Sequence, residues 1–353
     1  AFIIQFSYLI HLSLVSASLS EFHAYPLSVL FSSLLILFSR QKNNWPYYIT
    51  LTLLLFVQEN AAITALFFGL YLILSKDSRR RGLLTSFLGI AYLLLSTKLI
   101  IPLFSPTGSY LFETAYGSPL GNSYLEMIKN TLINPQLFIT TILSSTNLVY
   151  LGKLVLPVLP FALFAPGALL AGVLTLTPNL ISSASILKTL AMHYEAVSVP
   201  YLYYALILGV LFIIKHIKTN KVMLAGTISA VIMVATVIQY QLITSTRFSP
   251  SCVWSCRFYS VLDAEKDQVI ASIPQGASVS TQDYFSGHFA NRAGLYLFPV
   301  YYDRADYVVV STGDESWPLD QEDHHRYLAK LKDSQNHEVT LETDHFIVFK
   351  KDR

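Results

Sequence analysis

Residues 221–243 read KVMLAGTISAVIMVATVIQYQLI, an apolar run with no charged residue after Lys221. About 20 apolar residues in a row are enough to cross the hydrocarbon core of a bilayer as an α-helix. The charge density changes at the end of this run. Residues 1–246 hold 13 Lys and Arg and 6 Asp and Glu, whereas the shorter part 247–353 holds 11 and 16. The run therefore separates a membrane-embedded part of the chain from a water-soluble part.

The composition of the whole chain agrees with this division. Of its 353 residues, 53% are hydrophobic and 13% are charged. A soluble domain carries about 25% charged residues, so the composition excludes a typical cytosolic enzyme. It also excludes a disordered chain, because disorder requires low hydrophobicity and a high net charge.

The first part predicts about nine transmembrane or re-entrant helices. Several are short for a full crossing, and Pro157, Pro160 and Pro166 predict broken helices, which neighbouring protein can accommodate inside a membrane. The predicted fold class is an α-helical polytopic membrane protein, residues 1–246, with a small C-terminal extracytoplasmic α/β domain, residues 247–353. The expected helical segments are 2–18, 24–39, 46–58, 61–75, 83–103, 148–164, 167–180, 199–215 and 222–243.

The basic residues of the first part predict its orientation, because cytoplasmic loops are enriched in Lys and Arg. Counting the expected helices places three basic loops on one side of the membrane. We therefore expect a multi-pass protein of the plasma (inner) membrane with its C-terminal domain outside. The chain shows neither an initiator Met nor a signal-peptide pattern, so we expect an upstream portion to precede Ala1. The basic loops hold Arg40 and Lys42; Lys76, Arg79, Arg80 and Arg81; and Lys215, Lys218 and Lys221.

Polar residues cluster at three places on the expected outer side. Ionisable residues near membrane depth are costly and point to function, so we interpret the clusters as parts of one polar cavity. The alternative is that they are interfacial loop residues in contact with water or lipid headgroups. His23 and His193 could bind a metal together with glutamates, although their spacing matches no metal-ligand motif. The clusters are Glu21-Phe22-His23, Gln58-Glu59-Asn60 and His193-Tyr194-Glu195, with Asn179 after Pro178.

Two further features lie outside the expected membrane helices. An amphipathic stretch near Tyr124–Phe138 predicts a helix along the membrane surface. Cys252 and Cys256 are the only cysteines, and in an oxidising compartment they are candidates for a disulfide. Two free thiols are the alternative. A zinc or haem site is not indicated, because no CxxC or CxxCH motif is present.

The C-terminal part alternates helix and strand patterns, which predicts a small α/β sheet. The pair His324-His325 lies on a charged segment and predicts a solvated helix face. The excess of acidic residues excludes a nucleic-acid binder. No phosphate-loop, dinucleotide or nucleophile-elbow motif is present, so we predict no catalytic site there. The expected helices are 264–273, 283–292 and 320–333, and the expected strands are 278–281, 295–299, 307–311, 339–343 and 346–350.

Short motifs along the chain resemble those of one family. Glu21-Phe22-His23 resembles its Asp-Phe-His-x-Glu, and Val57–Ala62 resembles its Lys-Glu-Asp-Ala-Ala. Pro178-Asn179-Leu180 and His193-Tyr194 match its Pro-Asn-Leu and His-Tyr elements. The family is the domain-of-unknown-function 2079 group of polytopic bacterial and archaeal membrane proteins. Its C-terminal signature resembles the run from Ile273-Pro274 to Ser278-Val279-Ser280, then Asn291-Arg292, Phe298-Pro299 and Ala305-Asp306-Tyr307.

These proteins are similar to the GT-C glycosyltransferase superfamily, whose members use polyprenyl-phosphate-linked sugars at the outer membrane face. The resemblance therefore implies a GT-C-like glycosyltransferase, with Glu59 and Glu21 as candidate catalytic carboxylates that deprotonate an acceptor hydroxyl. The cofactor is open, and a divalent metal ion is one candidate. The implied partners are membrane lipids, a lipid-linked sugar donor and other integral membrane proteins. The candidate substrate-binding residues are His23, Asn60, Asn179, His193 and Tyr194.

The chain also departs from the family pattern. Glu21 replaces an Asp, Tyr25 replaces an acidic residue, and Gln58 stands where a basic residue is common. GT-C enzymes usually carry a catalytic Asp or Glu in a first outer loop, which we expect to precede this chain. A second hypothesis is therefore a non-catalytic integral membrane subunit or scaffold of a larger complex. A transporter ranks last, because neither inverted repeats nor charges deep in the bundle are evident.

Overall fold

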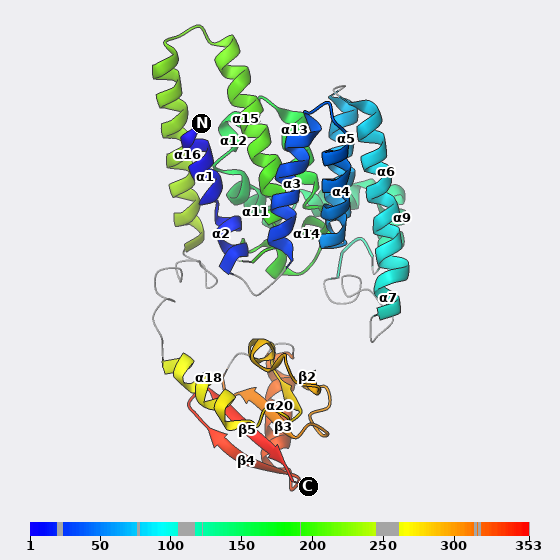
Figure 1. Ribbon diagram of the computed structural model, residues 1–353, viewed down its shortest axis with the longest axis vertical. Coiled ribbons are helices and arrows are strands. Elements are labelled where there is room, and N and C mark those ends of the chain that lie inside the picture. Colours follow the sequence, from blue (N-terminus) through cyan, green and yellow to red (C-terminus); the bar gives the residue numbers. More distant parts are fainter. Residues whose placement is uncertain are drawn as a thin grey trace. The chain divides into compact units, whose positions relative to one another are not determined.

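The computed structural model describes residues 1–19, 24–75, 78–104, 117–121, 123–190, 192–244, 261–313, 316 and 319–352. The chain divides into two compact units, Ala1–Val253 and Trp254–Arg353 (Figure 1). The expected domain boundary at residues 246 and 247 lies outside the described residues.

The described part of the first unit is built from helices. In chain order they are α1 Phe2–Leu9, α2 Leu12–Leu19, α3 Tyr25–Ser39, α4 Trp45–Val57, α5 Ala61–Leu74, α6 Arg79–Leu95, the π-helix η1 Ser96–Ile100, α7 Ile101–Phe104, α9 Tyr124–Ile133, α10 Pro135–Ile142, α11 Ser145–Val155, α12 Leu159–Ala162, α13 Pro166–Leu174, α14 Thr177–Ile181, the 3₁₀-helices η2 Ser185–Lys188 and η3 Ala196–Ser198, α15 Val199–His216 and α16 Lys221–Thr244.

Several of these helices are apolar enough for a membrane. Among the described residues, three continuous helical stretches are also long enough to cross one, namely Arg79–Phe104, Ala196–His216 and Lys221–Leu242. The helices α10 and α11 pass the same test together but are bent by 50°. The helices α3, α4 and α5 are apolar but shorter. The protein thus carries several apolar helices, while the count of about nine transmembrane or re-entrant helices stays a prediction.

The predicted helix breaks occur at the prolines. Helix α11 ends at Val155, before Pro157, and α13 begins at Pro166. Proline ends a helix because its ring removes the N–H donor and clashes with the preceding turn. The stretch near residues 124–138 is not one helix, since Asn134 divides it into α9 and α10, and its place along the membrane surface stays a prediction. The Asn134 side chain caps α10 by accepting from the backbone N–H of Leu137 at 3.2 Å.

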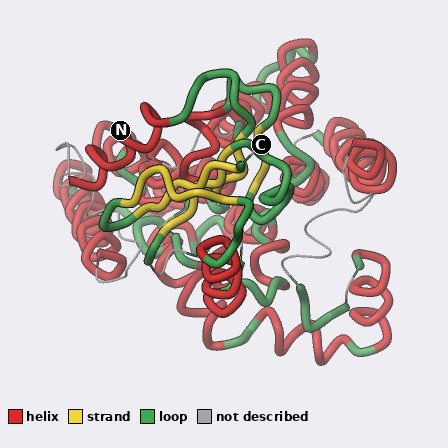
Figure 2. Tube along the Cα trace, turned by 90° about the horizontal axis from the view of Figure 1, so that it is seen from below, coloured by secondary structure: helices red, strands yellow, loops and turns green. Residues whose placement is uncertain are grey.

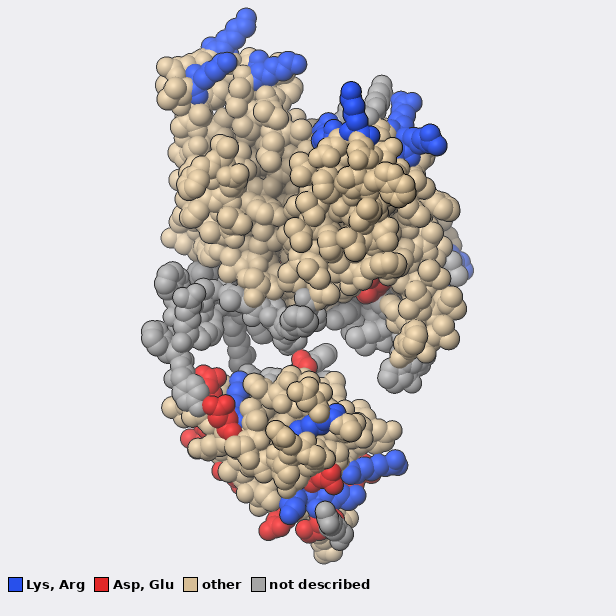
Figure 3. All heavy atoms as spheres, viewed as in Figure 1, with Lys and Arg blue, Asp and Glu red and all other residues tan. Residues whose placement is uncertain are grey.

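The helices run alternately between two ends of the first unit. The α3–α4, α5–α6 and α15–α16 connections, which carry the three basic loops, lie at one end (Figure 1). Lys and Arg side chains gather at that end in Figure 3. Helix α4 runs away from this end and stops at Val57, and α15 begins at Val199 and runs toward it. The turn Gln58–Asn60 and the segment before α15 therefore share the opposite end, which we call the acidic end.

The second unit is a five-stranded sheet with helices on both faces (Figure 2). Its strands lie in the order β2-β1-β3-β5-β4. Strand β1 pairs parallel with β2 and β3, and β5 pairs antiparallel with β3 and β4. The elements are α18 Val261–Ser272, β1 Val279–Thr281, α19 Asp283–Ser286, the 3₁₀-helix η4 Gly287–Phe289, β2 Leu295–Leu297, β3 Tyr307–Ser311, α20 Gln321–Lys332, β4 His337–Glu342 and β5 Phe346–Lys351.

Each face of this sheet has its own apolar core. Val269 of α18 packs with Val309 on one face, and Leu331 of α20 packs with Val310 on the other. The expected small α/β sheet is confirmed. The helix expected to reach Arg292 ends earlier, at Phe289. The solvated face predicted for His324 is wrong.

His324 is buried, with 1% of its surface exposed. Its Nε2 donates to the Ser311 carbonyl at 3.0 Å, so the imidazole fixes α20 to the end of β3. The acidic residues next to His324 in the sequence led to the prediction of a solvated face, because they lie on the exposed part of the same helix.

Candidate functional site

Tyr25, at the beginning of α3, lies at the centre of a polar cluster at the acidic end. Its side chain is 6% exposed. The Tyr25 ring lies 5.1 Å from the His193 ring, and the His193 ring lies 4.4 Å from that of Tyr194. The Tyr25 hydroxyl interacts with the Asn60 side chain, and the Glu59 and Glu195 carboxyls lie close enough to act on it electrostatically. Three separate segments of the chain therefore meet at one tyrosine.

Apolar packing holds Tyr25 in this position. Tyr25 forms a small buried cluster with Ala17 of α2 and with Ala196 and Val197 of η3. The turn Gln58–Asn60 is short because α4 ends at Val57 and α5 begins at Ala61. Asn60 is half-buried there, and its Oδ1 has no hydrogen-bond partner among the described residues.

Glu195 is the most deeply buried carboxylate of the cluster. It is 0% exposed, and among the described residues neither carboxylate oxygen has a hydrogen-bond partner. The Tyr150 hydroxyl and the backbone amides of Leu190 and Glu195 approach the carboxyl, but not in ordinary hydrogen-bond geometry. Glu195 precedes the apolar stretch Ala196–His216. Burial raises the pKa of the Glu195 carboxyl to about 8, because an apolar environment disfavours its charged form.

Tyr150 connects Glu195 to the Pro-Asn-Leu segment in α14. The Asn179 side chain donates to the Tyr150 hydroxyl at 3.1 Å, and both residues are buried. Asn147 fixes α14 beside α11, since its side-chain amide donates to the Leu180 carbonyl at 2.8 Å. Asn179 therefore lies behind Glu195, linked to it through Tyr150.

The backbone before Glu195 is strained. Leu190 has a φ of 59° and is buried. A non-glycine residue in this region costs about 1–3 kcal/mol, and such residues concentrate at functional sites. The Ser16 hydroxyl donates to the Leu190 carbonyl at 3.0 Å and ties this turn to α2. The turn presents His193, Tyr194 and Glu195 together.

The structure brings most of the predicted site residues together. Glu59, Asn60, His193 and Tyr194 lie around Tyr25, and Asn179 reaches the group through Tyr150 and Glu195. The other candidates, Glu21, His23, Cys252 and Cys256, lie outside the described residues.

Sequence reasoning placed Glu195 in the expected polar cavity without a catalytic or substrate-binding role, and it did not select Tyr25 or Tyr150 as site residues. Glu195 had a usable signal, because it follows the His-Tyr motif directly and ends a polar triplet. Tyr25 had a weaker one, as a departure from the family's acidic residue. Tyr150 lies in an apolar stretch, where an aromatic residue predicts packing alone.

A metal site was the open question for these residues. Within the described ranges, no three His, Cys, Asp or Glu side chains come together in a way that could hold a metal ion. The chemistry that the cluster offers is that of hydrogen-bond donors, an imidazole and two carboxyl groups in different environments.

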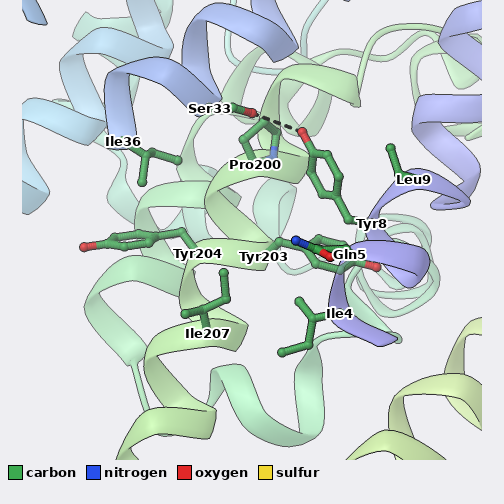
Figure 4. Close-up of a pocket in the computed structure, with 10 residues that line it drawn as sticks. All are labelled: Ile4, Gln5, Tyr8, Leu9, Ser33, Ile36, Pro200, Tyr203, Tyr204 and Ile207. Carbon is green, nitrogen blue, oxygen red and sulfur yellow. Dashed lines mark hydrogen bonds between the residues drawn. The ribbon is translucent and has the colours of Figure 1, made fainter. Parts of the chain in front are cut away.

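A separate cavity of about 490 Å³ lies between α1, α3 and α15 (Figure 4). Its walls are mostly apolar, with Tyr8, Tyr203 and Tyr204 among them. The Tyr8 and Ser33 hydroxyls are hydrogen-bonded at 3.1 Å across it. The residues that line this cavity include none of the Tyr25 cluster.

Comparison with known sequences places the chain in a family. A search of curated proteins found no match, and a search of solved structures found none either. A family profile described as "Predicted membrane protein (DUF2079)" matches residues 1–348, nearly the whole chain. This protein therefore belongs to the DUF2079 family of predicted membrane proteins.

Proposed function

We propose that this protein transfers a sugar from a polyprenyl-phosphate carrier to an acceptor at the extracytoplasmic face of the membrane. One observation carries the proposal. The segments Glu59-Asn60 and His193–Glu195, far apart in the sequence, meet at Tyr25. The cluster thus offers a carboxylate that can act as a base and an amide, an imidazole and a tyrosine hydroxyl that can donate hydrogen bonds, and a glycosyl transfer can use these groups.

Glu59 is the general base in this proposal. It is half-exposed, unlike Glu195, and so remains open to a substrate. The acceptor oxygen forms a bond to the anomeric carbon of the sugar while the bond from that carbon to the phosphate oxygen breaks. The acceptor proton passes to Glu59, and polyprenyl phosphate departs. The Asn60 amide and the His193 imidazole supply hydrogen bonds to the phosphate.

A lipid-linked donor suits the position of the cluster. The cluster lies at one end of a unit whose helices are apolar, so a donor that arrives from the bilayer reaches it along the membrane. The extracytoplasmic side follows from the basic loops at the opposite end.

The substitution Glu59→Gln tests this proposal. Loss of a general base lowers the rate by about 100-fold or more. The assay follows the release of labelled sugar from a panel of undecaprenyl-phosphate hexoses and pentoses, in membranes that contain the wild-type or variant protein. The matched control is Glu126→Gln, which alters an exposed carboxylate in α9.

Full activity of the Glu59→Gln variant would refute the assignment of Glu59 as the general base. A wild-type protein that transfers nothing but copurifies in fixed ratio with other membrane proteins would favour the scaffold hypothesis.

A further inference from the structure

Glu195 combines complete burial with two carboxylate oxygens that have no hydrogen-bond partner among the described residues. An ionised carboxylate in such a place loses its hydration and gains nothing in return. Proteins resolve this conflict by pairing the charge with a cation or by keeping the group protonated.

The surroundings of Glu195 favour the protonated form. The groups that act on it from the described elements are the Tyr150 hydroxyl of α11 and the backbone of its own segment, and neither Lys nor Arg is among them. The nearby Tyr25 hydroxyl of α3 already lies within reach of a second carboxylate, Glu59. His193 lies against the rings of Tyr25 and Tyr194. Two ionised carboxylates around one tyrosine would repel each other.

We propose that Glu195 is a neutral carboxylic acid at physiological pH and a positioning residue that adds no negative charge of its own to the cluster around Tyr25. A protonated carboxyl keeps a carbonyl oxygen that can accept a hydrogen bond, and the Tyr150 hydroxyl, which itself accepts from Asn179, is the donor that faces it. If the proposed function is right, the neutral group also lowers the repulsion that an anionic phosphate donor meets in the site. The protonation state of Glu195, the first part of this inference, stands without the proposed function. The effect on an anionic donor, the second part, rests on that function.

Infrared difference spectroscopy of the purified protein in nanodiscs tests the first part. Protonated carboxyls give a carbonyl stretching band that is separate from the bands of ionised carboxylates. We expect such a band at pH 6 that disappears as the pH rises through about 8, the pKa of the Glu195 carboxyl. The band should be absent from Glu195→Gln and retained in Glu59→Gln. A wild-type spectrum at pH 6 with no such band, or a band that survives in folded Glu195→Gln, would overturn the inference.

A second variant, Tyr150→Phe, tests the inference if Glu195→Gln does not fold. The Tyr150 hydroxyl lowers the pKa of the Glu195 carboxyl, against the larger effect of burial. Tyr150→Phe should therefore move the midpoint of the band's titration to higher pH. A midpoint that stays unchanged or moves to lower pH contradicts the assignment of the band to Glu195.

Binding of undecaprenyl phosphate tests the second part. For wild-type protein we expect the Kd to rise roughly tenfold between pH 7 and pH 9, because about one carboxyl in ten stays protonated one unit above its pKa. In Glu195→Gln this rise should be absent. The comparison of the two proteins corrects for the protonation of the lipid phosphate, which affects both equally. A Kd that rises equally in both proteins refutes the effect on the anionic ligand. If the infrared band is present but no sugar transfer occurs, the proposed function fails alone; if transfer occurs without the band, this inference fails alone.

Discussion

Arg81 lies in the first turn of α6, yet its side chain is only 7% exposed. Its guanidinium donates to the carbonyls of Ser39, at 2.7 Å, and Gln41, at 3.1 Å, and also to the Asn44 side chain. It lies 4.9 Å from the centre of the Tyr47 ring. In the sequence this residue is one of several loop charges. In the structure it fixes the connection between α3 and α4.

We expect Arg81→Gln to lower the free energy of unfolding by about 2–4 kcal/mol, because the buried Ser39 carbonyl loses its charged donor. Arg80→Gln is the matched control, because Arg80 is an exposed neighbour of Arg81 and its substitution removes the same charge. Thermal unfolding in detergent measures both variants. Equal stability of the two variants would show that the hydrogen bonds of Arg81 to the α3–α4 connection do not stabilise the fold.

The sequence predicted part of the site at the level of single residues. Polar side chains between apolar runs, such as Glu59 and His193, were visible because they are costly near a membrane. Tyr25 and Tyr150 were not, because a tyrosine in an apolar stretch is equally compatible with simple packing. Which carboxyl is buried depends on the tertiary contacts around Glu195, and a sequence pattern does not contain them.

At the scale of elements, small residues allow α5 and α6 to pack closely. A Cβ added at Gly82 would lie 2.6 Å from the backbone oxygen of Gly69, and one added at Gly89 would lie 2.7 Å from that of Ala62. Helices in a membrane associate through such close backbone approach, because burial of apolar surface gives little driving force there. The face Gly69-Gly82-Gly89 therefore helps to hold α5, and with it the turn that carries Glu59.

We expect Gly82→Val to destabilise the protein by about 1–3 kcal/mol, since backbone atoms must move apart to make room. Gly226→Val in α16 is the control, because a Cβ at Gly226 meets no atom within 4 Å. The unfolding temperature in detergent and the yield of folded protein distinguish the two. A Gly82→Val protein as stable as the Gly226→Val protein would mean that α5 and α6 separate at little cost.

The helix breaks show which ends of helices can be predicted from nearby residues and which cannot. The breaks at Pro157 and Pro166 were predictable, since proline acts through its own ring. The break between α1 and α2 was not. There the His11 Nδ1 accepts from the backbone N–H of Ser13 at 3.3 Å, while its Nε2 lies 3.2 Å from the Leu154 carbonyl. The partner of His11 is distant in the sequence, so the single helix expected for 2–18 becomes two.

At the scale of the whole molecule, the chain consists of two units made for different surroundings. The helices of the first unit expose large apolar side chains such as Phe56, Leu74 and Phe87, as a lipid environment requires. The second unit has charged side chains over its surface (Figure 3) and closed cores on both faces of its sheet. The charge counts of the sequence predicted this difference, because charge content reflects the solvent rather than the fold.

The basic end of the first unit predicts its orientation in the membrane, and reporter fusions test that prediction. Alkaline phosphatase is active only after export, and green fluorescent protein fluoresces only when it folds in the cytoplasm. We expect phosphatase activity without fluorescence for fusions after Asp352, and the reverse for fusions after Thr219 in the α15–α16 connection. Replacing Lys215, Lys218 and Lys221 with Gln should preserve this pattern, because the basic residues of the other two loops still favour the cytoplasm. Fluorescence of the fusion after Asp352 would invert the orientation and place the Tyr25 cluster on the cytoplasmic side, away from any extracytoplasmic acceptor.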